Sequence, residues 1–169
     1  MTSDSRFRLR LDSRSESQTV AIGRTLGEQL EPRTVVGLVG PLGAGKTCFS
    51  RGIASGLGLD PRELCSPSFL YLVHYEGGRL PLNHADLYRL ADLPEEARIE
   101  NYASLGLYEA TEGEGVTVVE WWEYFRGPDP AQLVTVEFSV KKSNHRVILV
   151  FLPESSVETV GWALKRHAD

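Results

Sequence analysis

Apolar and polar residues alternate along the start of the chain with two different periods. Over residues 7–11 apolar residues alternate with arginines, which predicts a strand with one apolar face, at an edge or end of a sheet. Ser15 and Gln18 fit a capping box, and apolar residues then recur every fourth position until a proline interrupts them. The chain is therefore predicted to begin with a strand, followed by a helix over 16–30.

The most apolar stretch of this region comes next. Residues 34–39 (TVVGLV) form a nearly continuous apolar run, typical of a strand that is buried on both faces. A glycine-rich turn over 40–47 follows this run, and a helix is predicted from about 46 to 57. Strand, glycine-rich turn and helix thus follow one another directly.

The remaining pattern predicts two hairpins with a helical region between them. Two β-like runs within 69–86 flank Glu76-Gly77-Gly78, which indicates a hairpin and hence a mixed sheet. The other predicted elements are an acidic, mostly helical region over 87–112, a buried strand over 115–120, a second hairpin around the polar turn 141–144, and a short helix over 155–167.

The glycine-rich turn carries the clearest chemistry. Residues 40–47 (GPLGAGKT) match the pattern GxxxxGK[ST] in every fixed position, and they lie between a predicted strand and a predicted helix. In such a loop the backbone N–H groups and the helix N-terminus bind phosphate oxygens. Lys46 would reach the β and γ phosphates, and the Thr47 hydroxyl would bind magnesium. The alternative is a turn that merely joins strand to helix. The residues expected to hold a nucleotide are Gly40, Gly43, Ala44, Gly45, Lys46, Thr47 and Cys48.

Two carboxylates end apolar runs and are candidates for metal binding or catalysis. Hydrolysis needs an acid that holds the metal or orients a water molecule, in addition to the phosphate loop. Glu120 ends the run VTVV and Asp86 ends RLPLNHA, where strand ends meet a phosphate loop. The alternative for each is a helix N-cap. His84 would lie on the same side of a strand as Asp86 and could orient that carboxylate, or it could be a structural histidine.

Three further segments have open interpretations. Ser68 lies where P-loop switches place a hydroxyl that senses the γ phosphate, or it belongs to a simple proline turn. The aromatic residues within 121–125 favour core packing, with base stacking or a partner surface as the alternative. The basic residues within 141–146 indicate a solvated hairpin tip or, alternatively, a contact with phosphate or RNA backbone.

These patterns predict one domain over 1–169 with an α/β fold, a P-loop NTPase-like mixed sheet flanked by helices, with β-hairpin additions. The 18 basic and 23 acidic residues give a net charge of −5, which argues against direct, unaided binding to nucleic acid. Two cysteines outside a CxxC spacing make neither a disulfide scaffold nor a four-ligand zinc site. Without an apolar leader or membrane-length segment, a cytoplasmic protein is expected.

Several motifs together resemble one family. The strings GPLGAGKTCFSRG at 40–52, SPSF at 66–69, HADLYRL at 84–90 and VVEWWE at 118–123 are similar, in order and spacing, to the bacterial TsaE-type ATPases of transfer-RNA threonylcarbamoyladenosine synthesis. The resemblance extends over most of residues 15–152, and HxDLYRL together with EW is its most specific part.

The resemblance implies a small ATPase that uses ATP and Mg²⁺ and assists TsaD and TsaB in modifying adenosine 37 of transfer RNA. Such a protein is not itself the transferase, and it meets transfer RNA only indirectly, through the complex. By position, Lys46 and the loop amides hold phosphates, Thr47 and Glu120 bind magnesium, and Asp86 supports the metal or the attacking water. Glu16, Thr19 and His145 correspond loosely to nucleotide-side positions.

The sequence departs from the family pattern at several positions. Pro41 stands where an acid is usual, Ser68 replaces threonine, Trp122 replaces proline, and Ser17 with Gln18 replaces two acids. Two rival functions stay open: a small P-loop kinase, which would need a lid with arginines, and a nucleotide-gated switch protein. The GTPase form of the switch lacks a guanine-reading NKxD string.

Overall fold

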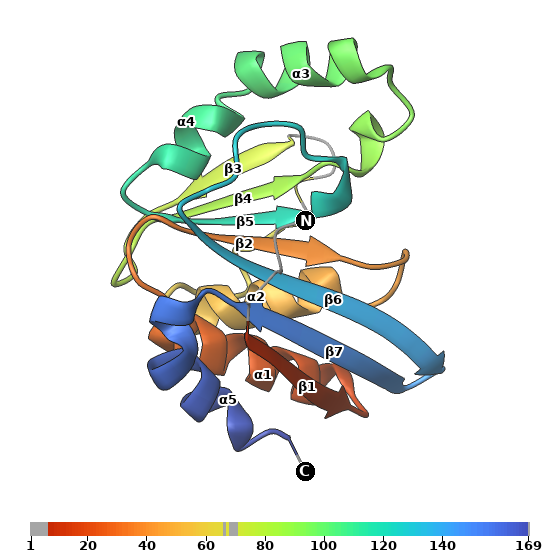
Figure 1. Cartoon of the computed structure of the whole chain (residues 1–169), viewed down its shortest axis with the longest axis vertical. Coiled ribbons are helices and arrows are strands. Elements are labelled where there is room, and N and C mark those ends of the chain that lie inside the picture. The colour runs from red at the N-terminus through yellow and green to blue at the C-terminus, as the bar shows by residue number, and fades with distance from the viewer. Residues whose placement is uncertain (1–6, 66, 68–70, 169) are drawn as a thin grey trace.

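A mixed β-sheet forms the frame of the molecule. The computed structural model describes residues 7–65, 67 and 71–168, and within them seven strands have the order β1-β7-β6-β2-β5-β4-β3 (Figure 1). The strands are β1 (Phe7–Ser13), β2 (Thr34–Val39), β3 (Leu72–Tyr75), β4 (Leu82–Asp86), β5 (Val116–Glu120), β6 (Gln132–Lys142) and β7 (His145–Leu152). The sheet is mixed, as the hairpin pattern predicts, and β1 lies at one edge, as its one-sided apolar pattern predicts.

The parallel strands lie at the centre of the sheet. β2 pairs in parallel with β5 on one side and with β6 on the other, and β4 pairs in parallel with β5. Antiparallel pairs β1–β7, β6–β7 and β3–β4 complete the two sides. The carboxyl ends of β2, β4 and β5 therefore meet at one edge, where α/β proteins place their ligand sites.

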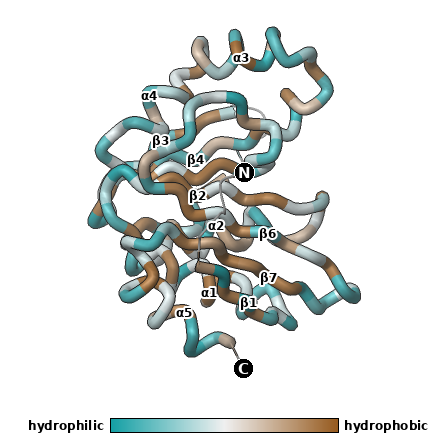
Figure 2. Tube along the Cα trace, in the orientation of Figure 1, coloured by the Kyte–Doolittle hydropathy of each residue, from teal (hydrophilic) through white to brown (hydrophobic). Residues whose placement is uncertain are grey.

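Helices cover the sheet on both faces. The α-helices are α1 (Glu16–Gln29), α2 (Lys46–Gly56), α3 (Glu95–Ser104), α4 (Leu107–Glu112) and α5 (Trp162–Lys165). Because side chains alternate along a strand, Val36 and Leu38 join the core that contains α1 and α2, whereas Val35 joins a second core with Tyr102 of α3. Figure 2 shows the hydrophobic residues concentrated along the strands between these layers.

Two regions differ from the predicted helices. The region 87–112 is divided into the 3₁₀ turn η2 (Tyr88–Leu90), α3 and α4, because Pro94 and Gly106 each start a new helix. The segment predicted as a short helix over 155–167 is helical but irregular: it consists of the 3₁₀ turn η4 (Glu154–Ser156), the π-helical turn η5 (Val157–Gly161) and α5. The short elements still bury Val160 and Leu164 against the sheet core.

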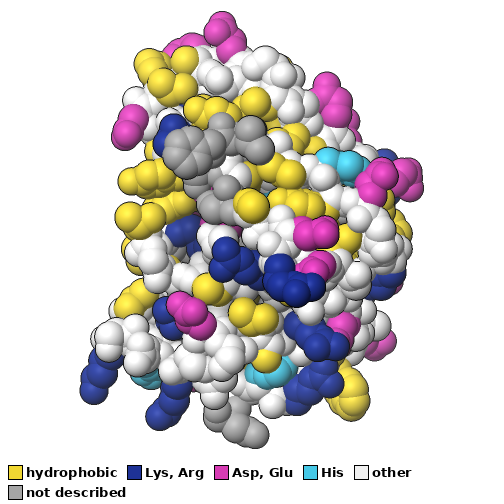
Figure 3. All heavy atoms as spheres, turned by 180° about the vertical axis from the view of Figure 1, so that it is seen from behind, with side chains coloured by type: hydrophobic (Ala, Val, Ile, Leu, Met, Phe, Trp, Pro, Cys, Tyr) yellow, Lys and Arg dark blue, Asp and Glu magenta, His cyan; other side chains and the backbone are white. Residues whose placement is uncertain are grey.

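Basic side chains are concentrated on part of one face of the molecule. On the face seen in Figure 3, lysine and arginine side chains gather over the middle and the end opposite α3, while acidic side chains occur at the α3 end and also over the middle. The first turn of α3 contains Glu95 and Glu96, which suits the positive end of the helix dipole. Among the described residues, no helix has the length and apolar character needed to cross a membrane.

Glycines let α1 and α2 pack backbone against backbone. A Cβ atom at Gly23 or Gly27 of α1 would lie 2.4 Å from the carbonyl oxygen of Phe49 or Ile53, respectively. From the other side, a Cβ at Gly52 of α2 would lie 2.3 Å from the Val20 carbonyl oxygen. Glycine lowers intrinsic helix stability, so at these positions the close approach of the two helices outweighs the low helix propensity of glycine. The approach fixes α2, whose first turn belongs to the glycine-rich loop.

We expect Gly27→Ala to destabilise the protein by about 1–3 kcal/mol, because the added methyl group overlaps the Ile53 backbone and forces the helices apart. Gly161→Ala is the matched control: Gly161 has helical φ and ψ, and its nearest new contact is 3.5 Å away. Urea unfolding of both variants measures the difference. Equal free energies of unfolding in the two variants would contradict the tight packing.

Candidate functional site

The glycine-rich loop joins the buried strand β2 to the first turn of α2. Gly43 and Gly45 have φ of 74° and 104°, in the left-handed region that L side chains rarely adopt. Gly45 is the N-cap of α2 and carries no side chain that could occupy the free N–H groups of the first turn. The loop and the helix start therefore present backbone donors and the positive helix dipole at one place.

Lys46 is largely buried and reaches back across the loop. Its Nζ donates to the carbonyl oxygens of Gly40 at 2.5 Å and Pro41 at 3.0 Å, and it lies 3.7 Å from the centroid of the Trp121 ring. Burial lowers the pKa of the Lys46 ammonium, and the negative charges of Glu120, Glu123 and Asp86 act against that shift. A buried cation held by carbonyls and an aromatic ring is well suited to an anionic ligand.

Glu120 is the buried acid of the site. It ends β5 with 2% of its surface exposed, and its Oε2 accepts a hydrogen bond from the Thr47 hydroxyl at 3.0 Å. Its Oε1 accepts from Ser50 Oγ at 3.2 Å and from His84 Nε2 at 2.8 Å. The carboxylate thus connects α2, β4 and β5 at the carboxyl edge of the sheet.

Asp86 lies beside Glu120 because the two residues are direct neighbours in the parallel pairing of β4 with β5. Asp86 is buried, and its Oδ1 accepts a hydrogen bond from the Tyr88 N–H at 2.9 Å. It is not the N-cap of the following 3₁₀ turn, because that position belongs to Leu87. The suggestion that His84 orients Asp86 is wrong: among the described residues, Nε2 of His84 bonds to Glu120 and Nδ1 has no partner.

A pocket of about 260 Å³ opens between these elements. Most residues singled out by sequence line it, namely Glu16, Gly43, Ala44, Gly45, Lys46, Thr47, Cys48, Asp86 and Glu120. Gly40 does not line the pocket, but its carbonyl oxygen accepts a hydrogen bond from Lys46, which does. Thr19 is buried nearby and bonds to Ser13 Oγ at 2.7 Å, so its hydroxyl supports the chain before α1. Ser68 lies outside the described residues.

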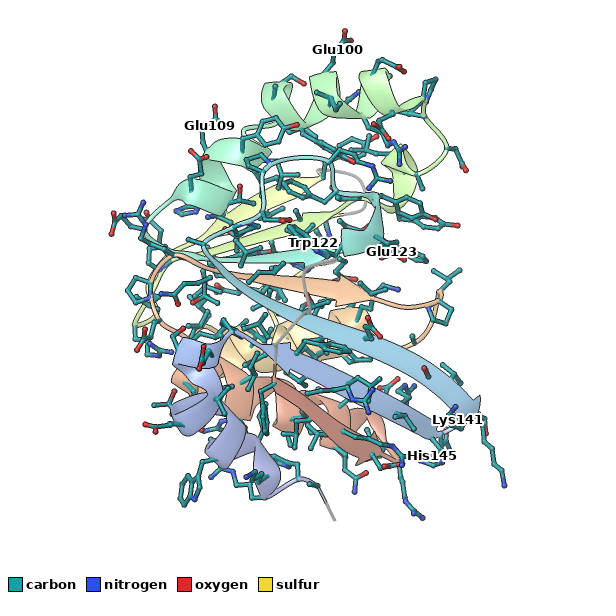
Figure 4. The ribbon with its side chains drawn as sticks, viewed as in Figure 1. Glu100, Glu109, Trp122, Glu123, Lys141 and His145 are labelled. Carbon is teal, nitrogen blue, oxygen red and sulfur yellow. The ribbon has the colours of Figure 1, made fainter. Side chains whose placement is uncertain are left out.

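His145 and Arg146 have different places relative to this pocket. The imidazole of His145 pairs with Asp12 on the edge strand β1 and does not line the pocket. Arg146 lines it and donates from Nε to the Ala44 carbonyl oxygen at 3.0 Å. Figure 4 shows His145 beside Lys141 at the hairpin end, away from Glu123 and Trp122. Neighbouring residues of a strand face opposite sides, so a shift of one position changes which side chain reaches the site.

Aromatic residues border the pocket and divide between two roles. Trp121 has φ of 61°, and its ring lies 5.0 Å from that of Tyr88, so both rings stand at the pocket beside Lys46. Phe125 belongs to the second core, and Trp121, Trp122 and Tyr124 pack against it, as the core interpretation predicts. A Cβ at Gly37 would lie 2.4 Å from the Trp122 ring, which explains a glycine within the buried strand β2.

The donor set of the pocket fits a magnesium ion bound together with phosphates. Among the described residues, no three histidine, cysteine, aspartate or glutamate side chains come together to form a metal cage. Magnesium commonly takes one or two protein oxygens and completes its shell with phosphate and water. Thr47, Glu120 and Asp86 provide hard oxygen atoms on the same side of the loop.

The mixed sheet, the loop between β2 and α2, and the acids at the ends of β4 and β5 define a P-loop NTPase-like α/β protein. A family model described as threonylcarbamoyl adenosine biosynthesis protein TsaE matches residues 13–148. The chain therefore belongs to the TsaE family.

Individual relatives agree with this assignment. The tRNA threonylcarbamoyladenosine biosynthesis protein TsaE of Treponema pallidum is 42% identical over 142 residues, which cover 84% of this chain and 99% of that protein. Its counterpart in Bacillus subtilis is 34% identical over 150 residues, 89% of each chain. The crystal structure of Bacillus subtilis YdiB matches with a TM-score of 0.75 at 28% identity, covering 99% of this chain and 100% of that one.

The opposite orientations of Arg146 and His145 can be tested. We expect Arg146→Ala to weaken nucleotide binding about tenfold, because the guanidinium lines the pocket and supports the loop through Ala44. His145→Ala, on the opposite side of the strand, should change the dissociation constant by less than about twofold. Titration calorimetry with ATP compares the two variants. A larger loss of ATP affinity in His145→Ala than in Arg146→Ala would show that His145, not Arg146, faces the nucleotide.

Proposed function

We propose that this protein is a Mg²⁺-dependent ATPase that assists the formation of threonylcarbamoyladenosine at adenosine 37 of transfer RNA, together with TsaB and TsaD. Membership in the TsaE family supports the pathway. The observation that carries the ATPase assignment is the convergence of Lys46, Thr47, Glu120 and Asp86 on one pocket. The protein is not itself the transferase in this proposal.

The loop would hold the nucleotide by its phosphates. Residues 43–48 line the same pocket as Lys46, so the backbone donors at the start of α2 and a cation would meet the phosphates at one place. A phosphate oxygen offers Lys46 a stronger partner than the neutral carbonyls of Gly40 and Pro41. Glu16 and Arg146 line the same pocket and are the proposed contacts outside the loop.

Thr47 and Glu120 would hold magnesium, with Asp86 beside them. Thr47 and Glu120 already share a hydrogen bond, so their oxygen atoms lie together, and Asp86 is adjacent to Glu120 across the sheet. Bound magnesium would neutralise charge on the phosphates during transfer to water. Asp86 would hold the attacking water or support the metal, and Lys46 would stabilise charge that develops on the phosphate oxygens.

The charge of the protein fits an assisting role. With a net charge of −5 the chain has little attraction for transfer RNA by itself, so we propose that contact with RNA passes through TsaB and TsaD. In this proposal the protein acts in the cytoplasm. Nucleotide binding and hydrolysis would then serve turnover of the complex.

The phosphate and metal roles give separate predictions. Lys46→Ala should weaken ATP binding at least about 100-fold, because a charged hydrogen-bond donor is lost from a largely buried site. Glu120→Gln should retain binding without metal but lose Mg²⁺-dependent phosphate release. Lys141→Ala, on the exposed hairpin, is the control for the loss of one positive charge. Wild-type affinity in Lys46→Ala would refute the phosphate loop.

The assisting role predicts that partners stimulate hydrolysis. Purified protein should release phosphate from ATP slowly, and TsaB with TsaD from the same organism should raise the rate at least about tenfold. The measurement is Mg²⁺-dependent phosphate release with ATP, with GTP as the comparison nucleotide. Fast ATP turnover with a small-molecule acceptor would favour a kinase. Tight ATP binding without hydrolysis, both in the protein alone and in the presence of TsaB and TsaD, would favour a nucleotide-gated switch.

A further inference from the structure

His84 is a polar side chain in a fully buried position of the sheet. It lies on β4 with 0% of its surface exposed. Its Nε2 lies 2.8 Å from Glu120 Oε1, and among the described residues its Nδ1 has no hydrogen-bond partner. Burying an imidazole with one unpaired nitrogen costs free energy. The contact with Glu120 is therefore the feature that explains a histidine at this position.

The Glu120 carboxylate depends on few donors. Its Oε2 accepts from the hydroxyl of Thr47, which is also a proposed metal ligand. Its Oε1 lies within hydrogen-bond distance of Ser50 Oγ, but that hydroxyl also lies 3.0 Å from the Lys46 carbonyl oxygen. A hydroxyl has one proton and can donate to one of these acceptors at a time. The Nε2–H of His84, in contrast, donates its hydrogen bond to Glu120 alone among the described residues.

We propose that His84 is a positioning residue for the metal site: its Nε2–H holds Oε1 of Glu120, so that Oε2 stays directed at Thr47 and the nucleotide pocket. This role rests on the proposed Mg²⁺-dependent ATPase. It parallels the outer hydrogen bonds that orient ligands around metal ions, whose loss typically lowers metal affinity or activity 10- to 100-fold. His84 touches neither the pocket nor Lys46 directly; it acts through Glu120.

Register explains how His84 reaches Glu120. In the parallel pairing of β4 with β5, His84 lies opposite Val118 and Asp86 lies opposite Glu120. Residues two apart share a face of the sheet, so His84 and Glu120 both face the α2 layer, diagonally across the two strands. A shorter side chain at position 84 would leave a gap before Oε1. A longer amide can place its nitrogen close to the position of Nε2.

Two amides at position 84 test the proposal. His84→Gln keeps a donor near the Nε2 position, whereas His84→Asn carries the same amide one methylene group short of it. For each full-length variant, the dissociation constant of a non-hydrolysable ATP analogue is measured by calorimetry in EDTA and in saturating Mg²⁺. The ratio of the two constants reports how strongly the metal and the nucleotide support each other's binding. His74→Asn, on the exposed side of β3, is the matched histidine control.

We expect all variants to bind the analogue in EDTA within about twofold of the parent, because the loop and Lys46 are intact. The Mg²⁺ ratio should fall at least about tenfold in His84→Asn and stay within about threefold of the parent in His84→Gln and His74→Asn. A parent-like ratio in His84→Asn overturns the proposal, and so does an equal loss in the two amide variants. A parent that binds the analogue equally well with and without Mg²⁺ overturns the metal-dependent function itself.

Discussion

The hydrogen bonds around the Glu120 carboxylate hold the site together. An anion with 2% of its surface exposed is costly unless donors surround it, and Thr47, Ser50 and His84 supply those donors. They come from α2 and β4, whereas Glu120 ends β5. The carboxylate therefore fixes the first turns of α2 against two strands, and the position of the glycine-rich loop follows from that connection.

Close packing behind the site supports the same geometry. The glycines of α1 and α2 bring the helices into backbone contact, which sets the depth of α2 over the sheet. Gly37 leaves room for the Trp122 ring on the opposite face of β2, and the chain immediately before that ring carries Glu120 and Trp121. Packing on both faces of β2 thus helps to position the site: α2 on one face carries the end of the glycine-rich loop, and the Trp122 ring on the other face follows Glu120 in the chain.

Much of this arrangement could be predicted from the sequence, because it depends on local patterns. The buried strands, the glycine-rich loop and the acids at strand ends follow from periodicity and spacing, and most of the pocket lining was identified from them. Arg146 was missed in favour of His145 because a one-residue change of register reverses the face of a strand. The partner of His84 was missed because spacing along one strand cannot tell which side chain of the next strand is closer. The π-helical turn at 157–161 gives no signal in the hydrophobic pattern.

The pairing of β1 with β7 has a consequence for the order in which the protein can fold. Phe7 pairs with Leu152, so β1 can join the sheet only after the chain has been synthesised as far as β7. The pocket likewise needs residues that lie far apart in the sequence, because Glu16 and Arg146 both line it. Such long-range closure slows folding relative to chains with local contacts. A chain that stops before β7 would contain the glycine-rich loop but would lack Arg146, which forms part of the pocket wall.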